Sequence, residues 1–182
     1  MGKFNFIETK IKDLYIIEPY VFRDEMGYIM ETYNERDFKS FNLDIDLKFV
    51  QFNEVKFKKG VLRGLRFQEK HAQNKLVRVV EGEVFDVAVD LRKDSHTYLQ
   101  WEGVTLSSEN KRQLYVPKGF AHGFLVLSDY ALVTCNYTQY YLPQFENGIA
   151  YNDPTLNINW PIDDIDKILL LDRDRNWENI QK

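Results

Sequence analysis

GEVFDVAVDLR, residues 82–92, decides the fold class, because apolar and polar side chains alternate along it. A period of two places successive side chains on opposite faces of an extended strand. One face carries the apolar set Phe85, Val87, Val89 and Leu91. Asp86 and Asp90 fall on the other face, so we expect these carboxylates to meet solvent or to bond to a loop.

Short segments of similar character follow one another along the rest of the chain, separated by Gly, Pro and other turn residues. Besides 83–92, we predict strands at 14–22, 28–33, 48–57, 61–67, 76–80, 98–106, 112–116, 123–127 and 131–139. Helical patterns are few, and they suit short helices at 35–41 and 161–171. Many short strands with little helix predict an all-β fold, and they leave a sandwich and a barrel both open.

Composition limits the class of protein. At 182 residues the chain is most simply one domain, 1–182, with enough length for a hydrophobic core. A formal net charge of −4 and short basic runs argue against a nucleic-acid binder. Cys135 is the only cysteine, so no intrachain disulfide can form, which fits a reducing compartment. We expect a cytoplasmic protein with no membrane partner, because signal-peptide and membrane-span patterns are lacking.

Several motifs in a fixed order carry the strongest functional signal. GVLRGLRFQEKHAQNK at 60–75 is followed by LSSEN at 106–110, VPKGFAHGF at 116–124, ND at 152–153 and DRD at 172–174. Together they cover nearly the whole chain. This set resembles the dTDP-4-dehydrorhamnose 3,5-epimerase family of nucleotide-sugar enzymes. The resemblance implies a cupin-type jelly-roll barrel with a few short helices and a ligand inside the barrel.

Members of that family are isomerases that use no cofactor and no metal. They exchange protons at C3 and C5 of a dTDP-4-keto-6-deoxyhexose through an enolate, on the route to rhamnose-type sugars. A histidine oriented by an aspartate acts as the base, a lysine stabilises the enolate oxygen, and a tyrosine on the opposite face returns a proton. The resemblance also implies a nucleotide-sugar ligand and a homodimer whose N-terminal strands reach into the partner.

Carried over residue by residue, the resemblance gives Lys75 as the enolate-stabilising lysine and Asp174 as the carboxylate that orients the base. It assigns substrate binding to a set spread over several strands: Arg63, Gln51, Asn53, Glu31 and His122. We expect no metal, because the histidines are far apart in the sequence and no HxH ligand pair is present.

Two positions depart from the family pattern where the chemistry belongs. Arg66 occupies the place of the catalytic histidine, and Cys135 occupies the place of the tyrosine. A guanidinium has no lone pair to accept a proton, so Arg66 cannot serve as a base. We expect it either to pair with Asp174 or to clamp a substrate phosphate or carboxylate. Cys135 is either a small core residue or, near Arg66 and Lys75, a thiolate that exchanges protons.

These assignments lead to two functional hypotheses. The first is a nucleotide-sugar epimerase-like enzyme whose catalytic set is Lys75, Asp174, Cys135 and Arg66, with Cys135, His122 or Asp174 supplying proton transfer. The alternative is a cupin that binds a nucleotide sugar without 3,5-epimerisation, or that catalyses a different carbon-acid reaction.

The motif at 60–75 also sets a geometric condition. Arg63 and Arg66 are three residues apart and would point to opposite faces of a regular strand. Both can line one cavity only if the strand is irregular between them. We predict a bulge or kink at Gly64.

Overall fold

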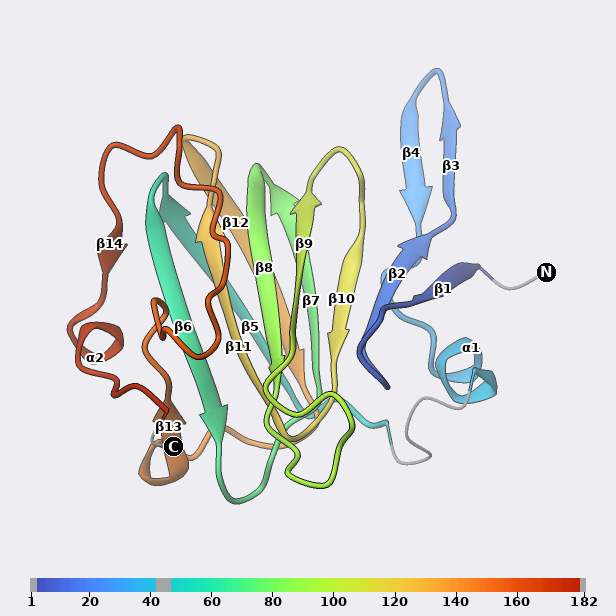
Figure 1. Ribbon diagram of the computed structural model, residues 1–182. Helices are drawn as coiled ribbons and strands as arrows, with labels where there is room; N and C mark the ends of the chain where they lie inside the picture. Colours follow the sequence, from blue (N-terminus) through green and yellow to red (C-terminus); the bar gives the residue numbers. More distant parts are fainter. Residues whose placement is uncertain (1–2, 42–46, 181–182) are drawn as a thin grey trace.

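The computed structural model describes residues 3–41 and 47–180, and its main body is two β-sheets that face each other (Figure 1). In spatial order the first sheet contains β1 (Phe4–Glu8), β2 (Tyr15–Pro19), β10 (Gln113–Val116), β7 (Lys75–Glu81), β12 (Tyr130–Tyr137) and β5 (Gln51–Lys58). The second contains β13 (Glu146–Gly148), β6 (Val61–Gln68), β11 (Phe120–Val126), β8 (Glu83–Asp90) and β9 (Trp101–Ser107), with β14 (Leu169–Leu170) parallel to β6. The predicted all-β class is confirmed.

Short elements lie outside these sheets. β3 (Val21–Asp24) and β4 (Gly27–Met30) form a separate hairpin that projects from the main body (Figure 1). The helical elements are α1 (Glu35–Ser40), a 3₁₀ turn at Pro143–Phe145 and α2 (Asp172–Arg175). The helix predicted at 35–41 is therefore confirmed. Among the described residues, no helix is long and apolar enough to cross a membrane.

A hydrophobic core occupies much of the space between the sheets. Strands of both sheets contribute alternate side chains to it, among them Val77, Val79, Ala88, Val104, Leu114, Phe124 and Val133. Fully burying one such aliphatic or aromatic side chain contributes about 1.5–3 kcal/mol to folding. This layer therefore holds the two sheets together.

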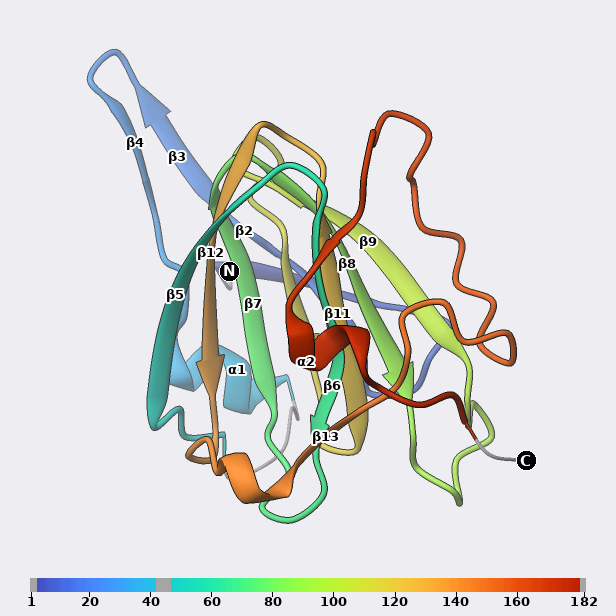
Figure 2. The same cartoon turned by 90° about the vertical axis from the view of Figure 1, so that its left-hand side faces the viewer.

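Part of the outer face of each sheet is covered as well. On the first sheet, Phe38 of α1 packs in one cluster with Leu76 and Tyr115. On the second, Ile149 and Trp160 of the C-terminal segment pack over the outward side chains of β6, β8 and β11. Figure 2 shows this segment running along the side of the second sheet. Strands buried on both faces lose the simple contrast between an apolar inside and a polar outside.

Because β8 is buried on both faces, the expectation that Asp86 and Asp90 both meet solvent or bond to a loop is wrong. Its apolar face packs against the C-terminal segment, which turns Asp86 and Asp90 toward the barrel interior, and both are fully buried. Asp86 does not meet solvent or a loop; it bonds to His122. Asp90, at the strand end, does bond to a loop. Its carboxylate accepts hydrogen bonds from three side chains there: Arg92, Ser95 and Thr97.

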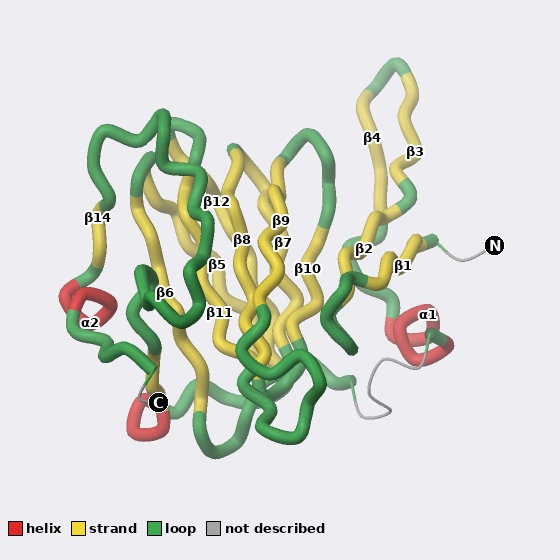
Figure 3. The backbone as a smooth tube through the Cα atoms, viewed as in Figure 1, coloured by secondary structure: helices red, strands yellow, loops and turns green. Residues whose placement is uncertain are grey.

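The predicted closing helix at 161–171 is wrong. That stretch consists of turns and extended chain as far as β14, drawn as loop in Figure 3. Its isoleucines have a helix-like spacing, but Ile165 and Ile168 each reach the cluster on the outer face of the second sheet. Asp163 and Asp164 form the turn itself, and aspartates favour turns because their carboxylates compete for nearby backbone groups.

The predicted irregularity at Gly64 is confirmed. The three-residue step from Arg63 to Arg66 on β6 faces the two-residue step from Phe124 to His122 on β11. Gly64 adopts φ +119°, a region that favours glycine. The extra residue turns both arginines to the same face of β6, as a bulge does.

We expect Gly64→Ala to be strongly destabilising. An added Cβ would lie 2.6 Å from Gly123 Cα and 2.7 Å from the His122 carbonyl oxygen. The loss in unfolding free energy, measured by chemical denaturation, should exceed the ~1–3 kcal/mol that an unfavourable backbone region costs alone. Gly27→Ala is the matched control, because Gly27 also has a positive φ, +144°, but has no atom within 4 Å of the added Cβ. Equal losses in both variants would contradict the steric argument.

Candidate active site

A cavity of about 290 Å³ lies between the two sheets, close to the lower end of the size range of small-molecule sites. The side chains suited to chemistry come from both sheets: Arg63, Arg66 and His122 from the second, and Lys75, Cys135 and Tyr137 from the first. Because the sheets face each other, a molecule bound here would be contacted from two sides.

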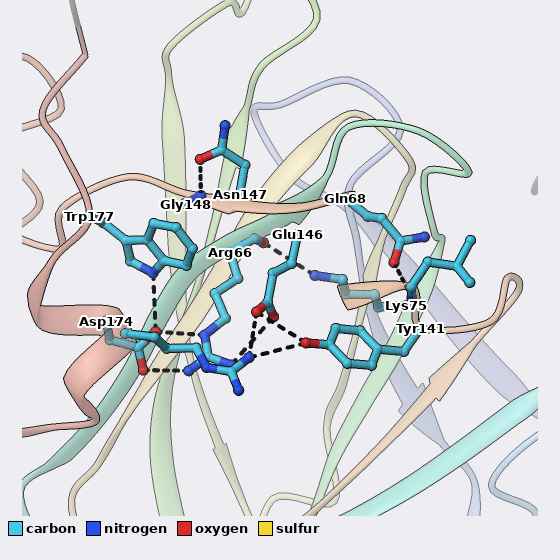
Figure 4. Close-up of polar contacts among 11 residues, drawn as sticks. Arg66, Gln68, Lys75, Tyr141, Glu146, Asn147, Gly148, Asp174 and Trp177 are labelled. Atoms are coloured by element: carbon cyan, nitrogen blue, oxygen red, sulfur yellow. Dashed lines mark hydrogen bonds and ion pairs between the residues drawn. The ribbon is translucent and has the colours of Figure 1, made fainter. Parts of the chain in front are cut away.

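Arg66 is held by a buried, bidentate ion pair (Figure 4). Its Nε and Nη2 donate to the two carboxylate oxygens of Asp174 at 2.6 and 2.7 Å. Asp174 lies in α2 and is 2% exposed, and Trp177 Nε1 donates to its Oδ1 at 3.2 Å. The ion pair expected from the sequence is present. Since this edge of the guanidinium is already used, Arg66 has little left to offer as a substrate clamp.

Glu146 extends the ion pair into a network (Figure 4). Its Oε1 accepts from Arg66 Nη1 at 3.5 Å. Its Oε2 accepts from the Tyr141 hydroxyl at 3.1 Å and from Arg173 Nη1 at 2.5 Å. This carboxylate therefore links two guanidinium groups and a phenol in one network.

Lys75 has no carboxylate partner among the described residues. It is 8% exposed, and its Nζ donates to the backbone carbonyl of Arg66 at 3.4 Å. Burial lowers the pKa of Lys75 below its ordinary value, because the charged form is desolvated. A buried ammonium without a counter-ion is costly in a folded protein. It is well placed to meet negative charge on a molecule in the cavity.

His122 and Asp86 form a second polar pair, on β11 and β8. His122 Nε2 lies 2.8 Å from Asp86 Oδ1, while Asp86 Oδ2 is buried with no hydrogen-bond partner. An ionised carboxylate can only accept, so Nε2 carries the hydrogen and a neutral ring keeps its lone pair on Nδ1. Within the described ranges, no group of three or more His, Cys, Asp or Glu is arranged to hold a metal ion.

Cys135 and Tyr137 line the cavity from β12. Burial raises the pKa of the Cys135 thiol to about 11, although Tyr137 and Lys75 act in the opposite direction. The thiol is therefore protonated at neutral pH, which favours the core interpretation over the thiolate. Burial also raises the pKa of Tyr137, and its hydroxyl is hydrogen-bonded to Cys135.

The other residues assigned to substrate binding are distributed unevenly. Arg63 and Asn53 line the cavity. Burial lowers the pKa of Arg63, which pairs with no carboxylate in the part of the chain that the structure describes. Gln51 does not line the cavity itself, but its Nε2 donates to Asn53 Oδ1 at 3.1 Å. Glu31 does not line this cavity; it follows β4 and pairs with Lys3.

The family model described as dTDP-4-dehydrorhamnose 3,5-epimerase matches residues 8–182. The chain belongs to this epimerase family. The dTDP-4-dehydrorhamnose 3,5-epimerase of Methanothermobacter thermautotrophicus is 49% identical over 182 residues, which is 100% of this chain and 97% of the relative. That of Salmonella typhimurium is 51% identical over 163 residues, 89% of this chain and 88% of the relative.

The fold agrees with a solved epimerase. The crystal structure of dTDP-6-deoxy-D-glucose-3,5-epimerase from Legionella pneumophila, in complex with dTDP-4-keto-L-rhamnose, is 46% identical in sequence. It superposes with a TM-score of 0.93 over 97% of this chain and 92% of that one. The resemblance to the family and the cupin-type jelly-roll fold are thus confirmed.

Sequence reasoning missed part of this epimerase-family site. Tyr137 follows Cys135 by two residues on an alternating strand, which was signal enough to place it inside the barrel. Glu146 and Arg173 carried no such signal, because β13 and α2 are too short to show a period in the sequence, and Glu146 lies 80 residues from Arg66.

Proposed function

We propose that this chain is an isomerase that exchanges protons at C3 and C5 of a dTDP-4-keto-6-deoxyhexose, in the biosynthesis of a rhamnose-type deoxysugar. The observation that carries the proposal is Lys75, a buried ammonium without a carboxylate partner among the described residues, in a cavity lined from two sheets. The relatives support the substrate class, since they are named for this reaction and one holds dTDP-4-keto-L-rhamnose.

A 4-keto group acidifies the hydrogens on C3 and C5, because loss of either leaves an enolate with negative charge on O4. In our proposal Lys75 meets that charge. Preorganised cations in a dry site stabilise such a transition state far better than water does. Arg63 and Asn53, with Gln51 behind them, hold the diphosphate and the sugar, since a free guanidinium edge suits phosphate oxygens.

Arg66, Asp174 and Cys135 have positioning roles in this proposal. The Arg66–Asp174 ion pair forms a fixed wall of the cavity, because Asp174 holds the guanidinium by two hydrogen bonds. The protonated thiol of Cys135 holds the hydroxyl of Tyr137.

We further propose a cytoplasmic homodimer. The β3–β4 hairpin exposes Phe22, Met26 and Ile29 at 53, 94 and 72%, an apolar surface that a second copy would cover. Glu31, just beyond this hairpin, would then lie near the partner's cavity rather than its own. A single cysteine suits a reducing cytoplasm. Light scattering should give twice the 21.7 kDa of one chain; the mass of one chain would refute the dimer.

Incubation with dTDP-4-keto-6-deoxyglucose in D₂O, read by NMR at C3 and C5, tests the function. We expect deuterium at both carbons, with inversion. Deuterium at one carbon would mean a narrower isomerase. The Arg66–Asp174 pair, at the position of the family's base, favours a second candidate: a cupin that binds the nucleotide sugar without turnover. Saturable binding by calorimetry without exchange would support it, and absence of binding would eliminate both.

A further inference from the structure

The proposed reaction needs a base and an acid, and several ionisable groups around the cavity are already engaged. Asp174 accepts two hydrogen bonds from Arg66. Glu146 already accepts hydrogen bonds from Arg66, Arg173 and the Tyr141 hydroxyl. Cys135 is a protonated thiol. These groups are poor choices for moving a proton.

His122 lies directly beside the position where the family's base belongs. His122 and Arg66 are register partners on β11 and β6. Partners on antiparallel strands point to the same face, with Cβ atoms about 4.5–5.5 Å apart. Asp86, 2.8 Å from Nε2, fixes the ring as a carboxylate fixes a catalytic histidine. An oriented imidazole therefore stands one strand away from Arg66.

Tyr137 lies one inward position along β12 from Cys135, about 6.6 Å further along the strand. Its register partner is Lys75, so the phenol and the ammonium come from adjacent positions of one sheet. Burial raises the pKa of Tyr137, which keeps its hydroxyl protonated as an acid requires. The other phenol of the cavity, Tyr141, lies beyond the end of β12 and is 39% exposed, and its hydroxyl donates to the Glu146 carboxylate.

The geometry assigns proton abstraction to His122, held by Asp86, and proton return to Tyr137. The base is thus His122, the register partner of Arg66 on the neighbouring strand, in place of a histidine at position 66. The acid is Tyr137, two residues further along β12, in place of a tyrosine at position 135. The two groups lie on facing sheets, since β11 belongs to the second sheet and β12 to the first. A sugar ring between the sheets would lose a proton from one face and regain one on the other. This assignment rests on the proposed function and names the groups that move protons in it.

The proposed steps conserve electrons and protons. The Nδ1 lone pair of His122 takes the proton from C3 or C5, and the C–H bonding pair becomes the C=C of the enolate. The carbonyl π pair moves to O4, beside the ammonium of Lys75. As the C=O re-forms, the carbon takes the hydroxyl proton of Tyr137 on the opposite face. Exchange with water returns the imidazolium and the phenolate to their neutral forms, so the net change is inversion at one carbon.

The base is tested with His122→Asn, on dTDP-4-keto-6-deoxyglucose in D₂O. Asparagine has no basic nitrogen, and its amide lies at the place of Nδ1; the longer glutamine also has no basic nitrogen, but its amide reaches the place of Nε2 and keeps a donor for Asp86. We expect deuterium uptake at C3 and C5 to slow by about 10²–10⁴, as removal of a general base commonly does. The affinity for dTDP, measured by calorimetry, should not change, and His122→Gln replaces this variant if it fails to fold. His96→Asn, on an exposed loop, is the matched control.

The acid is tested with Tyr137→Phe, which should separate exchange from inversion. His122 still removes the proton and can return deuterium to the same face, so label should enter with retained configuration. Inverted product should fall by about 10²–10⁴. Adding Cys135→Tyr to this variant supplies a phenol at the family's position and should restore inversion. Tyr130→Phe, exposed on the same strand, is the matched control.

The wild-type result separates this inference from the proposed function. If the wild-type chain shows no exchange, the proposed isomerase fails, and the assignment fails with it. If the wild-type chain exchanges deuterium and inverts the sugar carbons, and His122→Asn and Tyr137→Phe do so at the same rates, the proposed isomerase is supported. The assignment of His122 as base and Tyr137 as acid is then overturned. Equal loss of exchange and inversion in Tyr137→Phe would indicate a structural role for the phenol and would overturn its part.

Discussion

Lys75→Met should lower kcat by about 10²–10³, the loss typical for removal of one oxyanion-stabilising donor. Methionine keeps the length and apolar character of the stem but carries no charge. Because Lys75 pairs with no carboxylate among the described residues, its removal strands no buried anion, and the chain should remain folded. The ammonium acts on charge that develops in the enolate, so the loss should fall on kcat and spare the affinity for dTDP.

The pH profile gives an independent readout of Lys75. Burial lowers its pKa, so the ammonium is present below that folded pKa and is lost as the pH rises through it, earlier than for an ordinary lysine. Wild-type activity should fall along that alkaline limb, and the limb should be missing from the residual activity of Lys75→Met. Lys59→Met, at an exposed turn after β5, is the control. An unchanged kcat in Lys75→Met would contradict the role at the enolate.

The sequence predicted the strands well because alternation is a local property. The segments 48–57 and 131–139 correspond to β5 and β12 with ends that differ by a few residues. Which face of a strand looks into the barrel is not local. The apolar face of β8 is covered by Ile149 and Trp160, which come about 60–70 residues later in the chain. The alternation within β8 cannot predict contacts with so distant a segment.

The same limit applies to the site. The motifs placed Arg66 and Asp174 together across 108 residues, since a family resemblance carries long-range information that periodicity lacks. The charge state of Cys135 depended on how completely the barrel excludes water. Burial outweighs the nearby cations, and neither residue type nor spacing measures burial. The role of Asp86 was missed for a related reason: its partner His122 comes from a different strand.

Asp174→Ala should destabilise the chain by about 3–5 kcal/mol, because it leaves a buried guanidinium without its main partner. The Arg66 side chain is 13% exposed, and the remaining acid, Glu146 at 3.5 Å, is shared with Arg173. In a chain of this size each kcal/mol lowers Tm by about 2–4 °C, so Tm should fall by roughly 6–20 °C, measured by calorimetry. Glu35→Gln, which breaks the exposed pair with Lys39, is the control and should leave Tm nearly unchanged.

A double variant shows whether the ion pair stabilises the fold or only compensates for two buried charges. Arg66→Met with Asp174→Leu replaces both partners by apolar side chains, and such replacements of buried pairs are often neutral. We therefore expect it to recover most of the Tm lost in Asp174→Ala. If it does, stability is not what requires charge at these positions, and the pair's place in the wall of the cavity becomes the better reason for its presence. If the double variant is as unstable as Asp174→Ala, the ion pair itself holds α2 against β6.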